Sequence, residues 1–179
     1  MPLGLANFLG RPAFILSCEP DRATRVNTFI DVTFLIHRAT DIMSVAESET
    51  RRFAAQDSLH RMTRKFCELR KEKDQLKVVK VLGLKESMFF WEQDFLATAT
   101  WLTHFDELQQ LPLNVKMQIL KVGWVLWGRL EKLAKTADYR RKKQFGSDCF
   151  MIGDDACLDI QDFEVDISWC TNYTKEQLV

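Results

Sequence analysis

The stretch that most constrains the fold runs from Leu111 to Ala137 and reads LPLNVKMQILKVGWVLWGRLEKLAKTA. Between Ile119 and Leu130 only Lys121 and Arg129 are charged, and the run is too long for a β-strand. Apolar residues recur at steps of three and four, which predicts a helix with one apolar face: Leu113, Met117, Leu120, Trp124, Trp127, Leu130, Ala134 and Ala137. Because further apolar residues lie outside this stripe, we expect a central helix covered by neighbours on several sides.

Length, charge and cysteine spacing exclude several classes of protein. A chain of 179 residues favours one domain, and a formal net charge of zero argues against a chain built mainly to bind nucleic acid. The five cysteines are widely spaced and form no C-x-x-C pair, so we predict no metal site, no cofactor and reduced thiols. We also find no secretory signal and no stretch suited to span a membrane.

The rest of the chain is expected to cover the central helix. Residues 1–27 are rich in proline and glycine and are predicted to be irregular, and a first helix is predicted from Thr28 to Val45. A second helix, capped by Ser48 or Thr50 and running to about Arg70, is predicted to lie on the surface. A third helix is predicted from Glu86 to about Phe105, with Pro112 in the first turn of the central helix.

After Ala137 the pattern changes from helix to strand. Two short apolar runs around Gly153-Asp154-Asp155 predict a β-hairpin, and alternation from Phe163 to Trp169 predicts a third strand or an ordered crossing. The basic run Arg140 to Lys143 is typical of a solvated helix end, with nuclear import or a phosphate contact as the alternative.

An ordered set of residues runs through the central stretch and its lead-in: Trp101-Leu102, Leu111-Pro112-Leu113, Lys116, Ile119-Leu120-Lys121 and Gly123-Trp124. This order and spacing resembles the signature region of nuclear hormone receptor ligand-binding domains, above all the divergent nematode-type receptors. The likeness continues through Trp127, Tyr139-Arg140-Arg141-Lys142, Phe145-Gly146 and Val165-Asp166-Ile167-Ser168-Trp169.

The resemblance implies a mainly α fold, a partial three-layer helical sandwich with a small β-hairpin. Residues 28–179 would form a partial ligand-binding domain that stops just past the hairpin. The family's zinc-finger DNA-binding domain and its C-terminal helices, including the activation helix, would be absent. Without those helices one side of the Ile119–Leu130 helix should be uncovered, which favours association or binding of a hydrophobic dye.

The resemblance also implies an internal apolar pocket lined by the third and fifth helices of the family and by the hairpin. The candidate pocket residues are Trp91, Phe95, Ala99, Trp124, Trp127 and Met151, with Lys135 where retinoid-type receptors hold a ligand carboxylate. The alternative is that these side chains simply pack a core, because apolar stripes on helices are usually core.

A shallow coregulator groove is implied between the third and fourth family helices. Its candidate residues are Leu102, Thr103, Val115, Gln118, Ile119 and Lys121, with Lys121 at the negative C-terminal end of a guest helix. Thr103 departs from the lysine that many members have there, and Val115-Lys116 replaces the usual Asp-Gln. The alternative is a solvated lysine on a core helix.

The resemblance implies ligand-responsive regulation of transcription in the nucleus, and no catalysis. The partners would be a small apolar ligand, a coregulator helix or another receptor, with no direct DNA contact and no membrane. His37, His60 and His104 fall on separate predicted helices, away from any nucleophile motif. The alternatives are an interaction module that sequesters receptors or coregulators without DNA, and a truncated product without function of its own.

Overall fold

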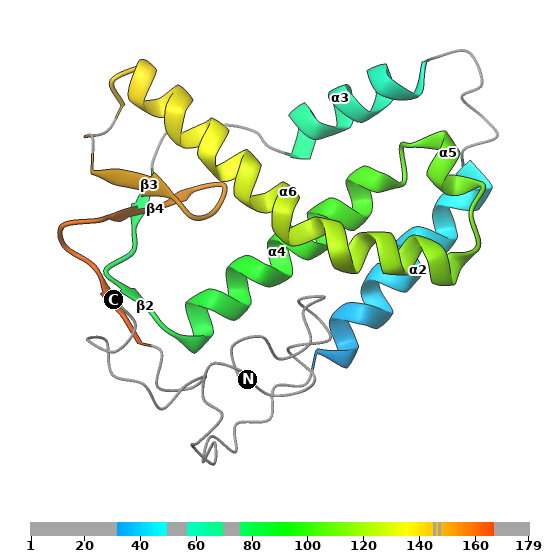
Figure 1. Cartoon of the computed structure of the whole chain (residues 1–179), viewed down its shortest axis with the longest axis horizontal. Helices are drawn as coiled ribbons and strands as arrows, with labels where there is room; N and C mark the ends of the chain where they lie inside the picture. Colours follow the sequence, from blue (N-terminus) through cyan, green and yellow to red (C-terminus); the bar gives the residue numbers. More distant parts are fainter. Residues whose placement is uncertain (1–31, 50–56, 70–75, 145, 147, 167–179) are drawn as a thin grey trace.

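The computed structural model describes residues 32–49, 57–69, 76–144, 146 and 148–166. The helices α4 (Leu84–Leu102) and α6 (Leu113–Arg141) cross in the middle of the molecule, and α2 (Thr33–Glu49) packs against both (Figure 1). A small group of strands lies at one end, beside the C-terminal half of α6. The predicted fold class, a mainly α layered sandwich with a β-hairpin, is therefore confirmed.

The helix α2 begins later than the sequence pattern predicts. The amides of Leu35 and Ile36 donate hydrogen bonds to the carbonyl of Val32 at 3.1 and 3.2 Å, and Val32 itself precedes the helix. The predicted start at Thr28 lies outside the described residues, as does the segment 1–27. One side of α2 is buried, because Leu35, Ala39 and Met43 have no exposed surface.

The helix α3 (Ser58–Leu69) lies on the surface, as predicted, and none of its residues is buried. The predicted cap at Ser48 is wrong, because Ser48 lies inside α2; Thr50 lies outside the described residues. The residue that caps the start of α3 is instead Asp57, whose side chain accepts a hydrogen bond from the amide of Leu59 at 3.4 Å. A side-chain oxygen near the free amides of a first helical turn is a common way to begin a helix.

Just before α4 begins, the Gly83 amide donates a hydrogen bond to the Glu86 carboxylate at 3.1 Å. The helix ends at Leu102, three residues before the predicted end. The short helix α5 (Asp106–Gln109) then reverses the chain. The Gln109 side-chain amide donates to the carbonyl of Leu102 at 3.2 Å, which satisfies a free carbonyl at the end of α4. Pro112 caps α6 instead of lying in its first turn.

The helix α6 continues past the predicted end at Ala137 to Arg141, so Arg140 and Arg141 lie in its last turn rather than beyond it. Its predicted apolar stripe fails in the second half. The steps of that stripe average less than 3.6 residues, so the stripe rotates around a helix of this length. The residues buried beyond Trp124 are Gly128, Glu131, Thr136 and Tyr139, whereas Leu130, Ala134 and Ala137 are exposed.

One side of α6 is uncovered, as expected from the family resemblance. Neighbouring elements therefore do not surround the helix. Ile119, Val122, Leu126, Leu130 and Leu133 are all exposed. The opposite side packs into the main core through Met117, Leu120 and Trp124, together with residues of α2 and α4.

The predicted hairpin is present as β3 (Cys149–Met151) and β4 (Ala156–Asp159), which pair antiparallel. Two further short strands precede α4: β1 (Lys77–Val78), which pairs parallel with β4, and β2 (Val81–Leu82). The alternating segment contributes the two-residue β5 (Glu164–Val165), which pairs parallel with β2 and not with the hairpin; residues 167–169 lie outside the described part. Among the described helices none is long and apolar enough to cross a membrane.

The one-sided burial of α6 gives a direct test on stability. Trp124 is 2% exposed and Leu126 is 56% exposed on the same helix. We expect Trp124→Ala to lower the free energy of unfolding by about 3–5 kcal/mol, because it leaves a cavity in the main core. Leu126→Ala, the matched control, should change it by less than about 0.5 kcal/mol. Chemical denaturation followed by circular dichroism measures both, and equal losses would contradict the orientation of α6.

Candidate functional site

The centre of the candidate pocket is a packed aromatic contact between α4 and α6. The rings of Phe95 and Trp124 meet edge to face, with centroids 5.7 Å apart and an interplanar angle of 83°. Ala99, one turn after Phe95, has no exposed surface, and Trp91 packs against the same core from a partly buried position. The structure therefore brings four of the seven candidate pocket residues into one core.

Met151 belongs to a second, smaller cluster on the hairpin side of α6. It has no exposed surface and packs with Tyr139 and Cys157. Its amide donates to the Thr136 hydroxyl at 3.0 Å, which fastens β3 to α6. Burial, followed by the neighbouring Cys149 thiol, raises the pKa of the Cys157 thiol above its usual value. Cys157 is therefore a poor nucleophile at neutral pH.

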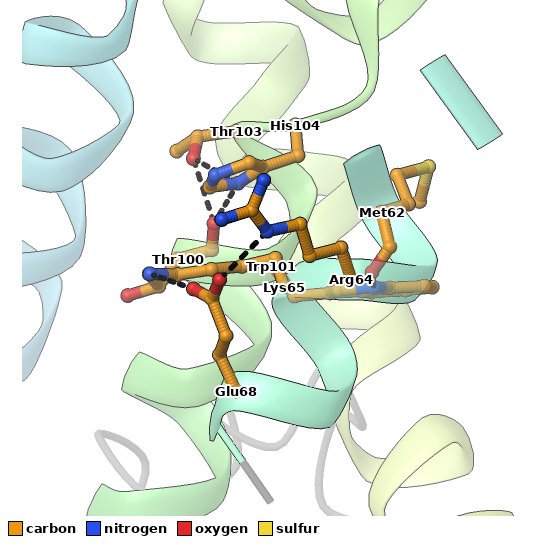
Figure 2. A network of polar contacts seen from close by, with 8 residues as sticks. All are labelled: Met62, Arg64, Lys65, Glu68, Thr100, Trp101, Thr103 and His104. Atoms are coloured by element: carbon orange, nitrogen blue, oxygen red, sulfur yellow. Dashed lines mark hydrogen bonds and ion pairs between the residues drawn. The ribbon is translucent and has the colours of Figure 1, made fainter. Parts of the chain in front are cut away.

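Trp127 lies in a third cluster, under α3. Its ring stacks on that of Trp101 with centroids 4.2 Å apart and an angle of 13°, and the Phe66 ring meets both edge-on. The Trp101 indole N–H donates to the carbonyl of Met62 at 3.0 Å, and Figure 2 shows this side chain lying against α3. These contacts hold α3 over the C-terminal half of α4.

Two lysines of α6 form ion pairs between the aromatic core and the hairpin. Lys132 of α6 binds Asp94 of α4, with side chains only 16% and 12% exposed. Gly128 leaves room for this pair, because a Cβ there would lie 3.2 Å from the Asp94 carboxylate. Lys135 binds Asp154 of the hairpin turn at 2.8 Å and Glu131 at 3.3 Å. Lys135 thus tethers the hairpin turn to α6.

The Asp94–Lys132 pair is not among the interactions predicted from the sequence, although the sequence contains a signal for it. Asp94 is the only acidic residue on the helical face that also carries Trp91, Phe95 and Thr98. A carboxylate on a buried face needs a cation nearby, because an unpaired buried charge is costly. The signal indicates that a partner exists but not which of several lysines supplies it.

The candidate groove residues lie at the junction of α4, α5 and the start of α6. Thr103 ends α4, where its hydroxyl donates to the carbonyl of Thr100 at 2.6 Å and contacts the His104 ring at 3.1 Å (Figure 2). Lys116 is fully buried and donates to Gln109 at 3.3 Å, so it braces α5 against α6. The remaining candidates are half-buried or exposed: Leu102, Val115, Gln118, Ile119 and Lys121.

The chemistry of the described part of the chain offers no metal centre: no group of three or more histidine, cysteine or carboxylate side chains could hold an ion there. The histidines are also separated. His37 lies on α2, His60 on α3 and His104 just after α4.

The span that contains α4, α6 and the hairpin matches a known family. The family model for the ligand-binding domain of nuclear hormone receptor matches residues 72–179. The chain belongs to the nuclear hormone receptor ligand-binding domain family. The resemblance seen in the signature residues of the sequence is confirmed by this match.

Curated relatives from Caenorhabditis elegans align with nearly the whole chain. Nuclear hormone receptor family member nhr-134 is 44% identical over 99% of this chain and 44% of its own length. Member nhr-103 is 42% identical over 99% of this chain and 45% of its own length. Member nhr-18 is 39% identical over 97% of this chain and 44% of its own length. The chain therefore spans less than half the length of these relatives. No solved structure gives a significant match.

The buried pair between α4 and α6 makes a second prediction. We expect Asp94→Ala to lower the free energy of unfolding by about 3–5 kcal/mol, because it leaves the Lys132 ammonium buried without its partner. Adding Lys132→Met should recover part of the loss, and thermal and urea denaturation of the double-mutant cycle measures the coupling. The control is Arg38→Met, which removes the exposed ion pair with Glu92 and should lower the free energy of unfolding by less than about 1 kcal/mol. Additive losses for Asp94 and Lys132 would show that the pair is not coupled.

Proposed function

We propose that this nuclear receptor domain is a ligand-responsive regulator of transcription that acts in the nucleus. In this proposal residues 28–179 form the ligand-binding unit and residues 1–27 lead into it. The observation that carries the proposal is the family match across residues 72–179, because that span holds α4, α6 and the hairpin. These are the elements that carry all seven candidate pocket residues.

The proposed ligand is a small, apolar and uncharged molecule. Phe95, Ala99 and Met151 have no exposed surface, so a ligand must displace side chains to reach them. Trp91 and Trp127 are only partly buried and offer the route by which the core would open. A carboxylate on the ligand would have to compete with Asp154 for Lys135, which disfavours acidic ligands.

The proposed protein partner of the groove is a coregulator helix. Leu102, Val115 and Ile119 would contact the apolar face of that helix, with Gln118 beside them. Lys121 makes no ion pair or hydrogen bond to any described residue, so its ammonium is available to the C-terminal end of a guest helix. Thr103 stands where many members of the family have a lysine, but it carries no charge and its hydroxyl already donates to the carbonyl of Thr100. In the proposed groove Lys121 is therefore the one cation, among these candidate residues, that can contact the guest helix.

A second candidate function is that of an interaction module that works without DNA contact, by binding other receptors or coregulators. The uncovered apolar side of α6 favours it, because exposed patches of this kind mark interaction sites. The two functions differ in one observable: only the first requires a small molecule.

A thermal-shift experiment tests the ligand directly. The full chain is incubated with fractions of a nematode lipid extract, and the melting temperature is followed by differential scanning fluorimetry. A ligand at a hundred times its Kd should raise the free energy of unfolding by about 2.7 kcal/mol. We expect Ala99→Leu to abolish the shift, because the added side chain occupies the space that the ligand needs between α4 and α6.

Ala134→Leu is the matched control, since Ala134 is exposed on α6 and should leave the shift unchanged. Because overpacking at Ala99 costs about 1–3 kcal/mol, each variant is compared with its own melt in the absence of extract. A chain that no fraction stabilises, or an Ala99→Leu variant that keeps the full shift, would contradict the proposed ligand site.

A further inference from the structure

The hairpin carries one cysteine on each of its two strands. Cys149 begins β3, Cys157 lies in β4, and both are free thiols. In the antiparallel register Cys149 lies opposite Asp159. Two positions further along, Met151 lies opposite Cys157. Because side chains two positions apart on a strand point to the same face, the two thiols share one face of the hairpin and are diagonal neighbours.

The backbone brings these two side chains toward each other. A ladder hydrogen bond joins the amide of Ile160 to the carbonyl of Asp148 at 2.8 Å, one position before Cys149. Since hydrogen-bonded and non-hydrogen-bonded pairs alternate in an antiparallel ladder, Cys149 belongs to a non-hydrogen-bonded pair, in which side chains lie closer together. A hydrogen bond joins the Cys149 and Cys157 side chains. The two sulfur atoms are therefore neighbours, although no covalent bond joins them.

Solvent reaches the two thiols unequally. Cys149 is partly exposed, whereas Cys157 is 2% exposed and packs with Tyr139 and Met151. Burial, followed by the electrostatic effect of Cys149 and Asp159, raises the pKa of the Cys157 thiol, so this thiol stays protonated at neutral pH. A reagent in solution therefore meets Cys149 first, and Cys157 reacts with a group already attached to Cys149.

We propose that Cys149 and Cys157 form a redox-sensitive dithiol, which a small disulfide such as oxidised glutathione converts to a disulfide that joins β3 to β4. Cys149 is the attacking thiol and Cys157 is the resolving thiol. The assignment rests on the shared face, the contact between the two side chains and their unequal exposure. Cys67 lies exposed on α3 and is not part of the pair.

The reaction consists of two exchange steps that balance. The Cys149 thiolate attacks one sulfur of oxidised glutathione, the disulfide bond of glutathione breaks, and one glutathione thiolate leaves and takes up the proton that Cys149 released. The Cys157 thiol then loses its proton, attacks the Cys149 sulfur in this mixed disulfide and releases the second glutathione. In total the chain gives up two electrons and two protons, and one oxidised glutathione becomes two reduced ones. The contact between the side chains raises the effective concentration of Cys157, which offsets its small thiolate fraction.

The disulfide is expected to be easy to reduce. Diagonal neighbours in a sheet have Cα atoms about 7–8 Å apart. A relaxed disulfide joins Cα atoms that are about 4.4–6.8 Å apart. Closing the bond must therefore draw the start of β3 toward β4, and strained disulfides are the labile and regulatory ones.

Closing the bond also acts on the attachment of the hairpin to α6. Met151, two residues after Cys149, fastens β3 to α6 through the hydrogen bond from its amide to Thr136. This attachment then depends on the oxidation state of the surrounding thiols. Met151 is a candidate pocket residue, so an effect of oxidation on ligand binding rests on the proposed function, whereas formation of the disulfide does not.

The test follows the disulfide by mass spectrometry. The reduced full chain is incubated with oxidised glutathione at neutral pH, its remaining thiols are blocked with N-ethylmaleimide, and it is digested without reductant. Cleavage before Asp154 and Asp155 separates Cys149 from Cys157, so the closed disulfide is found as two peptides joined together. We expect these joined peptides to be the main product at the two cysteines, and reduced glutathione should restore both thiols.

Three variants assign the two steps. In Cys157→Ala, Cys149 should stop at the mixed disulfide with glutathione. In Cys149→Ser, the buried Cys157 should take up glutathione at least roughly tenfold more slowly than the exposed Cys67 of the same chain. Cys67→Ser is the control and should leave the joined peptides unchanged. Circular dichroism checks each fold, and Cys149→Ser, at a partly exposed position, tests the order of the steps even where Cys157→Ala loosens the hairpin.

Several results would overturn the proposal. These are a wild-type chain in which Cys149 stops at the mixed disulfide, joined peptides that form only in urea, and a bond between Cys157 and Cys67. Another is a Cys149→Ser variant in which Cys157 reacts as fast as Cys67, because solvent would then reach Cys157 directly. A disulfide that reduced glutathione cannot open would also contradict the proposal, because the bond would then be permanent rather than redox-sensitive.

Discussion

The edge-to-face contact between Phe95 and Trp124 is the interaction on which the other packing depends. It joins the two long helices α4 and α6, and α2 packs against the same core with Leu35, Ala39 and Met43. Large aromatic rings suit this position because they bury much apolar surface and still fix an angle between helices. Once α4 and α6 are fixed in this way, the side of α6 that faces outward is fixed as well.

The buried charges extend this arrangement toward the hairpin. The pair of Asp94 and Lys132 joins α4 to α6 near the core, and Lys135 reaches from α6 to Asp154 in the hairpin turn. Such pairs add little net stability, since desolvation offsets their attraction, but they disfavour any shift that separates the partners. They give the candidate pocket a charged boundary on the hairpin side, where Lys132 and Lys135 already have carboxylate partners.

Periodicity predicted the helices and the hairpin well, because apolar spacing reports directly on the buried faces of Leu35, Ala39 and Met43. It failed on the second half of α6, where Gly128 and Glu131 are buried and Leu130 is exposed. That face is set by the ion pair of Asp94 in another helix and by contact with the hairpin, which no local pattern contains. The resemblance indicated which elements line the pocket, but the distribution of its residues over separate clusters required the structure.

The helix α6 has one packed side and one open side. Hydroxyl-radical footprinting of the full chain, read by mass spectrometry, measures this residue by residue. We expect strong protection of Met117 and Trp124, although methionine and tryptophan are intrinsically reactive, and clear modification of Leu126, Leu130 and Leu133. Modification of Trp124 together with protection of the three leucines would show instead that α6 is rotated about its axis.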